Sequence, residues 1–128
     1  MHTEMAVLAW AVALTIVQLL VAIVGTTTQF SMTTLVGNRE QPVVGSGWVG
    51  RAQRAHRNML ESLLPFAAVV LIANAIAASN HITLLGAQLF LYARVIYALL
   101  YIAGIPWLRT LAWTAGLVGI LMVLSQVI

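Results

Sequence analysis

The sequence of 128 residues contains no cysteine, no lysine and only three acidic residues. Without cysteine the chain has no disulfide, no thiolate metal site and no cysteine nucleophile. Charged residues make up 7% of the chain and hydrophobic residues 62%, whereas a soluble domain carries about 25% charged residues. The sequence therefore predicts an integral membrane protein that forms one domain over residues 1–128.

The basic residues are few and scattered. All six are arginine, and no two are adjacent in the sequence. A chain with so little soluble surface and no basic run is not expected to bind nucleic acid. Arginines beside apolar segments are more typical of membrane anchoring on one side of a bilayer.

Four apolar segments can each supply the roughly 20 residues that cross the hydrocarbon layer as a helix. They cover residues 5–24, 59–78, 82–105 and 108–128. A long polar connection, 25–57, separates the first two, and the short turns "ASNH" (78–81) and "GIPWLR" (104–109) separate the others. Only helices and closed barrels satisfy their backbone in lipid. We expect an all-α, four-transmembrane-helix antiparallel bundle.

The charges predict how the bundle is oriented. Five arginines fall in the first and third connections, which lie on the same side of four spans: Arg39, Arg51, Arg54, Arg57 and Arg109. The other side carries only Glu4. By the positive-inside rule the arginine-rich side is cytoplasmic and both termini are outside.

The second helix carries a polar stripe. At 100° per residue, its members fall within an arc of roughly 80° that runs from the loop into the bilayer. Arg57 and His56 point elsewhere, toward headgroups and water. The stripe consists of Arg51, Arg54, Asn58 and Glu61.

A second stripe lies on the third helix, within "FLYARVIYALLY". Phe90, Arg94, Tyr97 and Tyr101 share one face there. Arginine at mid-membrane costs ~2.5–3.5 kcal/mol on insertion scales, so it usually faces a partner or an aqueous cavity. Counted outward from residue 80, the two stripes reach similar depths, with Arg94 deeper than Glu61 by roughly 7 Å. Both stripes can then line one polar cavity near the cytoplasmic face, within one chain or across subunits.

Simpler interpretations stay open for these residues. Arg51, Arg54 and Arg57 could anchor the helix at headgroups, and Tyr97 and Tyr101 could be interfacial aromatic residues. Glu61 and Arg94 could form a buried pair that fixes helix register. The three histidines share no ligand spacing, so we expect no metal site.

Several arginines, an amide, a carboxylate and tyrosine hydroxyls suit a small anionic zwitterion. Arginine binds carboxylates bidentately, and Glu61 could accept an ammonium group. Glutathione has this chemistry, with two carboxylates, an ammonium, two amides and a thiol. A second, lipophilic substrate would arrive from the bilayer.

Three segments of the sequence resemble a known family: "RAHRNMLESLLPF", "YARVIYALLY" and "GNRE" at 37–40. The family is the MAPEG superfamily, the membrane-associated proteins of eicosanoid and glutathione metabolism. The resemblance is to its bacterial branch of microsomal-glutathione-transferase-like members. The resemblance implies a bacterial inner-membrane homotrimer with three glutathione sites between subunits. It implies glutathione binding by Arg54, Asn58, Glu61, Arg94, Tyr97 and Tyr101, with Arg51 nearby, and thiolate stabilisation by Arg109. Ser62 stands where several members have tyrosine, and Arg109 follows Tyr101 at a spacing about one residue different from better-known members.

Two functions follow from the resemblance. One is a glutathione transferase, with or without peroxidase activity, that attacks lipophilic electrophiles or lipid hydroperoxides, as in detoxification. The alternative is a non-catalytic lipid-binding scaffold, which the family also includes. A drug/proton antiporter of similar size would need a carboxylate in the first span, and residues 5–24 contain no charge.

Overall fold

The computed structural model describes residues 3–37 and 42–128. That part of the chain is helical and contains no strand. Four of its helices are long and apolar enough to cross a membrane, and α2 is a single short turn of helix. The helices are α1 (Glu4–Gln29), α2 (Met32–Val36), α3 (Gly47–Ala75), α4 (His81–Ala103) and α5 (Pro106–Val127).

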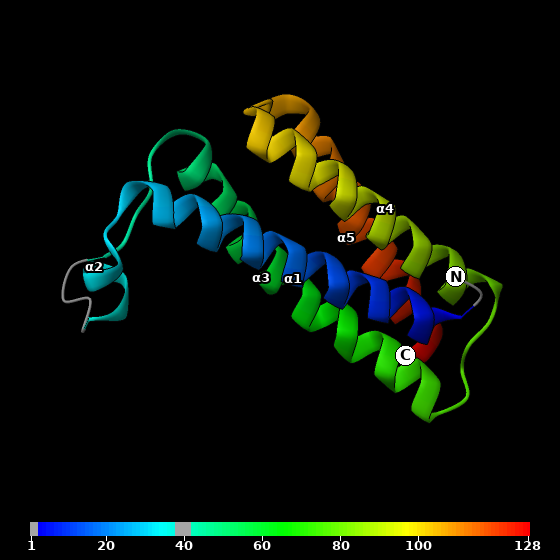
Figure 1. The fold of residues 1–128 in the computed structure, drawn as a ribbon. Helices are drawn as coiled ribbons and strands as arrows, with labels where there is room; N and C mark the ends of the chain where they lie inside the picture. The colour runs from blue at the N-terminus through cyan, green and yellow to red at the C-terminus, as the bar shows by residue number, and fades with distance from the viewer. Residues whose placement is uncertain (1–2, 38–41) are drawn as a thin grey trace.

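The four long helices form a bundle, as the sequence predicts. α4 packs most extensively against α5, and α1 packs most extensively against α3. Smaller contacts of α4 with α1 and α3, and of α3 with α5, join these two pairs. Figure 1 shows α2 at one end of the bundle and both chain ends at the other, beside the α3–α4 connection.

The first connection is shorter than predicted. α1 continues to Gln29, and α3 begins at Gly47, so helix occupies both ends of the predicted connection 25–57. The prediction ended the second span where the sequence turns from apolar to charged, because hydropathy marks the membrane boundary and not the end of a helix. Arginine, glutamine and alanine are good helix formers, so α3 begins well before the apolar segment. Arg51, Arg54 and Arg57 therefore lie on a helix.

The α3–α4 connection is an ordered turn over residues 76–80. The amide of Ala77 donates to the Asn74 carbonyl at 3.4 Å and that of Ala78 to the Ala73 carbonyl at 2.8 Å. This is the Schellman pattern, with Ala77 at φ 54° in the left-handed position that usually holds glycine. Asn80 then caps α4 through a capping box. α3 consequently ends three residues before the predicted limit of its span at residue 78.

The α4–α5 contact is close because both helices present glycine there. A Cβ added at Gly119 would lie 2.5 Å from the carbonyl oxygen of Gly86. Nearby, the rings of Phe66 and Phe90 stack at 4.0 Å between centroids and join α3 to α4. Backbone contact between small residues is the usual way in which helices pack tightly in lipid, and it fixes the α4 and α5 walls of the site described next.

Candidate functional site

Arg94 lies at the centre of the candidate site. Its side chain is 2% exposed, and its Nη1 donates to Oδ1 of Asn58 on α3 at 3.0 Å. Nε and Nη2 are buried without a hydrogen-bond partner among the described residues. Gly116 on α5 faces this side chain, and a Cβ there would make an ordinary van der Waals contact with Cδ of Arg94 at 3.5 Å. Most of the hydrogen-bonding capacity of a buried cation is thus unused.

Two tyrosine rings continue from Arg94 toward the end of α4. Cζ of Arg94 lies 4.0 Å from the centroid of the Tyr97 ring, and that ring meets Tyr101 edge-on at 5.5 Å. On Tyr101, Cζ of Arg109 lies 4.4 Å from the ring centroid and Cζ of Arg54 lies 6.0 Å from it. Cations over aromatic faces are attracted by the ring quadrupole. The rings therefore help to hold three arginines at one site without a carboxylate between them.

Two neighbouring cavities open beside these residues, and we call them together the polar cleft. One, of about 180 Å³, has a polar lining of Asn58, Glu61, Ser62 and Arg94. The other, of about 300 Å³, is lined by Asn58, Tyr97, Arg109, Thr110 and Trp113. Asn58 and Trp113 line both cavities, so α3, α4 and α5 together form a continuous polar region.

Glu61 does not pair with Arg94. Its side chain is exposed and lines the smaller cavity, and no ion pair to it is found in residues 3–37 and 42–128. The register-fixing Glu61–Arg94 pair considered from the sequence is therefore wrong, because Arg94 bonds Asn58 instead. The depth count assumed a tight turn at residue 80. Counted from the observed helix ends at Ala75 and His81, Arg94 is still closer in height to Glu61 than to Asn58, so it is the long Arg94 side chain that reaches Asn58.

Arg51 has a structural contact that the sequence analysis did not predict. Its Nε donates to the carbonyl of Ile102 in the last turn of α4 at 3.0 Å. A cation at a helix C-terminus satisfies an unpaired carbonyl and interacts favourably with the helix dipole. Arg51 thus ties the start of α3 to the end of α4, next to the cleft, whereas the side chain of Arg57 is exposed. Of the "GNRE" segment, residues 38–40 lie outside the described residues.

The comparisons with known proteins identify the family. The sequence model of the MAPEG family matches residues 7–128, nearly the whole chain. The chain belongs to the MAPEG family. No curated protein and no solved structure matches it. It is a multi-pass integral membrane protein of the family associated with glutathione and eicosanoid metabolism.

The cleft of this MAPEG protein includes one large side chain that is not among the site residues expected from the sequence. Trp113 lines both cavities. A signal was available, because Trp113 follows Arg109 by four residues and so shares its helix face. Thr110 lines the larger cavity as well.

Over residues 3–37 and 42–128 the MAPEG protein shows no grouping of metal-binding side chains. Three or more His, Asp or Glu residues do not come together anywhere in the part of the chain that the structure describes. The donors in the polar cleft are guanidinium, amide and hydroxyl groups, which bind anions and amides.

Proposed function

We propose that this MAPEG protein is a membrane-bound glutathione-dependent transferase or peroxidase, with glutathione bound in the polar cleft. The observation that supports this most is the buried guanidinium of Arg94, with Nε and Nη2 unpaired and the side chain lining a cavity of about 180 Å³. A buried cation needs a compensating anion. A carboxylate of glutathione supplies that charge and accepts bidentate hydrogen bonds from arginine.

Residues in and beside the cleft suit the other groups of glutathione. We propose Arg54, whose Cζ lies 6.0 Å from the centroid of the Tyr101 ring, for the second carboxylate and Glu61 for the ammonium. Asn58, Tyr97 and Tyr101 can bond the peptide amides. Family resemblance and chemistry assign these roles to them, with Arg51 beside them as a support for α4. Glutathione fits the donor set because the cleft combines cations, one carboxylate and neutral hydrogen-bonding groups.

Arg109 is the residue that we propose for thiolate stabilisation. It lines the larger cavity with Thr110 and Trp113 and lies over the Tyr101 ring. A nearby fixed cation favours the thiolate over the thiol. The thiolate sulfur would form a bond to an electrophilic carbon as the leaving group departs. In the peroxidase reaction it would attack a peroxide oxygen and break the O–O bond, which gives glutathione sulfenic acid and an alkoxide that takes a proton and leaves as the alcohol. A second glutathione would then reduce the sulfenic acid, with formation of glutathione disulfide and water.

Family resemblance also supports finer proposals about assembly and location. We infer a homotrimer with sites between subunits, in a bacterial inner membrane with the cleft toward the cytoplasm. The arginines of α3 and Arg109 on the same side support this orientation.

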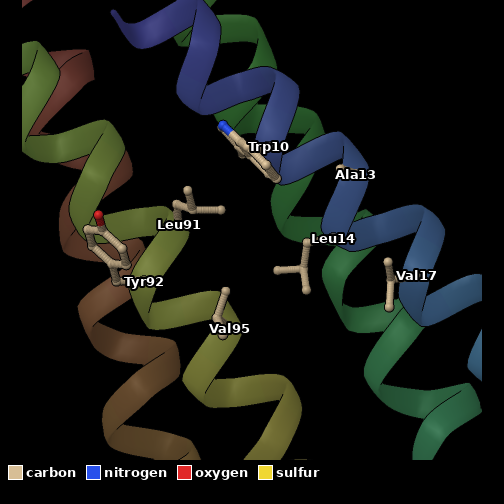
Figure 2. Close-up of a pocket in the computed structure, with 7 residues that line it drawn as sticks. All are labelled: Trp10, Ala13, Leu14, Val17, Leu91, Tyr92 and Val95. Carbon is tan, nitrogen blue, oxygen red and sulfur yellow. The ribbon is translucent and has the colours of Figure 1, made fainter. Parts of the chain in front are cut away.

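The alternative function, a non-catalytic lipid-binding scaffold, has one observation in its favour. An apolar groove of about 540 Å³ lies between α1 and α4, away from the arginines (Figure 2). A scaffold needs such a groove but does not need a cation positioned to stabilise a thiolate.

Calorimetry with millimolar glutathione, together with the ultraviolet absorbance of the bound thiolate, tests the proposal. We expect binding with a thiolate signal in the unaltered protein, and binding without that signal in Arg109→Ala. Arg57→Ala is the matched control, because Arg57 is an exposed arginine that lines neither cavity and, in contrast to Arg54, does not lie over the Tyr101 ring. Absence of glutathione binding in the unaltered protein would contradict the enzymatic function and favour the scaffold.

A further inference from the structure

The connection between α4 and α5 is short and leaves a backbone carbonyl for another part of the fold to satisfy. Two residues, Gly104 and Ile105, separate the end of α4 from the start of α5. Their amides donate to the Tyr101 and Leu100 carbonyls, each at 3.0 Å. This Schellman pattern, with Gly104 at φ 79°, satisfies two of the last four carbonyls of α4. The Ile102 carbonyl lies outside the pattern.

Arg51, near the start of α3, supplies the donor for that carbonyl. Its Nε donates to the Ile102 carbonyl at 3.0 Å. A Cβ added at Gly104 would lie 3.7 Å from the same Nε, so the guanidinium contacts residues before and after the end of α4. Arg51 lines neither cavity of the polar cleft. Any effect that it has on a ligand in the cleft would therefore pass through this connection.

The backbone around Arg51 is itself held against α1. Gln53, two residues later on α3, donates to Oγ1 of Thr26 at 2.9 Å and accepts from the Gly45 amide at 2.8 Å. Gln29, at the end of α1, accepts from the Ser46 amide at 2.8 Å. Arg51 thus extends from a fixed base toward the α4–α5 connection.

A cavity separates this part of α3 from the end of α4. It has a volume of about 170 Å³ and forms the inner end of the apolar groove, with which it shares Leu14, Val17 and Val95. Ala52 and Ala55 line it from α3 and Ile102 from α4, as does the buried amide of Gln18, which has no partner within the described residues. The two helices do not pack directly against each other across this cavity. The Arg51 side chain links them instead.

Arg109 lies one helical turn beyond the connection. Pro106 is the first residue of α5, and Arg109 follows it by three residues. Cζ of Arg109 lies 4.4 Å from the centroid of the Tyr101 ring, and the side chain lines the larger cavity of the cleft. Since Tyr101 and Arg109 stand on either side of a two-residue connection, the place of Arg109 depends on how that connection is held.

We propose that Arg51 is a positioning residue that fixes the α4–α5 connection and thereby holds Arg109 where it stabilises the glutathione thiolate. This inference rests on the proposed function. The hydrogen bond from Nε to the Ile102 carbonyl does the work, and the charge of Arg51 does not. Attraction between a cation and a thiolate falls with their separation, so an Arg109 that is free to move would stabilise the thiolate less.

Two substitutions separate the hydrogen bond of Arg51 from its charge. Arg51→Gln has an amide nitrogen as many bonds from Cα as Nε, so it keeps a donor and removes the charge. Arg51→Met has a similar length and no donor. The ultraviolet absorbance of the thiolate, recorded against pH at saturating glutathione, gives the apparent pKa of the bound thiol. Arg51→Met should raise this pKa by about 0.5–1, and Arg51→Gln should recover most of the lost thiolate.

A double variant and an affinity measurement test the route. In an Arg109→Ala background, Arg51→Met should barely change the thiol pKa, because the residue that it positions is absent. Glutathione affinity, measured by calorimetry at a pH where the thiol stays protonated, should change by less than about threefold in either Arg51 variant. Arg51→Ala repeats the loss of the donor in case Arg51→Met does not fold, since water can then reach the Ile102 carbonyl.

The alternatives give different results. Equal rises of the thiol pKa in Arg51→Gln and Arg51→Met would overturn the proposal, because the charge of Arg51 would then act directly. A large loss of affinity in both variants would also overturn it and make Arg51 a ligand of glutathione. An unchanged thiol pKa in Arg51→Met would overturn this inference alone, whereas absence of a thiolate signal in the unaltered protein would overturn the proposed function and this inference with it.

Discussion

The polar cleft and the apolar groove each contain one buried polar side chain with unused hydrogen-bonding groups. Arg94 and Gln18 together hold every buried, unpaired side-chain nitrogen or oxygen found in the described residues. Arg94 is partly compensated by the Asn58 oxygen and the Tyr97 ring. Gln18 has no such support. The difference follows from charge: a buried cation without any compensation costs far more than a neutral amide, so the fold itself supplies part of the environment of Arg94.

The largest expected effect comes from removing the charge in the cleft. Arg94→Met should weaken glutathione binding by at least about thirtyfold, because truncating a buried charged partner costs about 2–5 kcal/mol. Thermal stability without ligand should not fall, since an apolar side chain of similar length replaces an incompletely paired cation. Calorimetry and thermal unfolding measure both quantities.

The same calorimetry on Gln18→Leu shows whether the two cavities are independent. A loss of glutathione affinity as large as that of Arg94→Met would mean that cleft and groove form one site. Such a result would contradict the separation of the polar cleft from the apolar groove.

A second, intermediate effect is expected where α4 and α5 touch. Gly119→Ala should lower the free energy of unfolding by about 1–3 kcal/mol, the usual cost of overpacking. Its Cβ would lie 2.5 Å from the Gly86 carbonyl oxygen and 2.8 Å from the Phe90 nitrogen, both backbone atoms. Gly116→Ala on the same helix is the matched control, because its nearest neighbour would be 3.5 Å away.

Unfolding in mixed micelles measures the stability of these two glycine variants. Glutathione binding should weaken in Gly119→Ala, since α4 and α5 are both walls of the cleft. Equal stability losses in both variants would show that the Gly86–Gly119 contact does not limit the packing.

The smallest expected effect lies in the turns. Ala77 adopts φ 54° and Gly104 adopts φ 79°, both after the end of a helix. Ala77→Gly should raise the free energy of unfolding by up to about 1 kcal/mol, and Gly104→Ala should lower it by a similar amount, because only glycine enters the left-handed region without steric cost. Neither change should alter binding in the cleft, and a destabilised Ala77→Gly would contradict this account.

Hydropathy alone was sufficient to predict the four spans and the bundle, because lipid requires long apolar helices. Helical spacing also placed Arg94, Tyr97 and Tyr101 on one face, and the structure shows these three side chains in mutual contact through the ring of Tyr97. These features depend on local periodicity, which a single sequence displays.

Features that depend on the relative position of two helices could not be predicted. Which α3 residue meets Arg94 depends on how the two helices face each other and on the conformation of the long arginine side chain, and the count from residue 80 favoured Glu61 over Asn58. The inward position of Gln18 was also missed. A lone amide in an apolar span looks the same in the sequence whether it faces a cavity, a neighbouring helix or lipid.

The length of α3 has a consequence for how two unlike substrates would enter. Its 29 residues extend about 43 Å, whereas the hydrocarbon layer is about 30 Å thick. An excess of about 13 Å projects into the headgroups or water, and it falls at the end that carries Arg51, Arg54 and Arg57. Under the proposed function, glutathione would reach the cleft from water along this protruding helix, while a lipophilic substrate would enter sideways from the bilayer. Neither substrate would have to cross the medium in which the other dissolves.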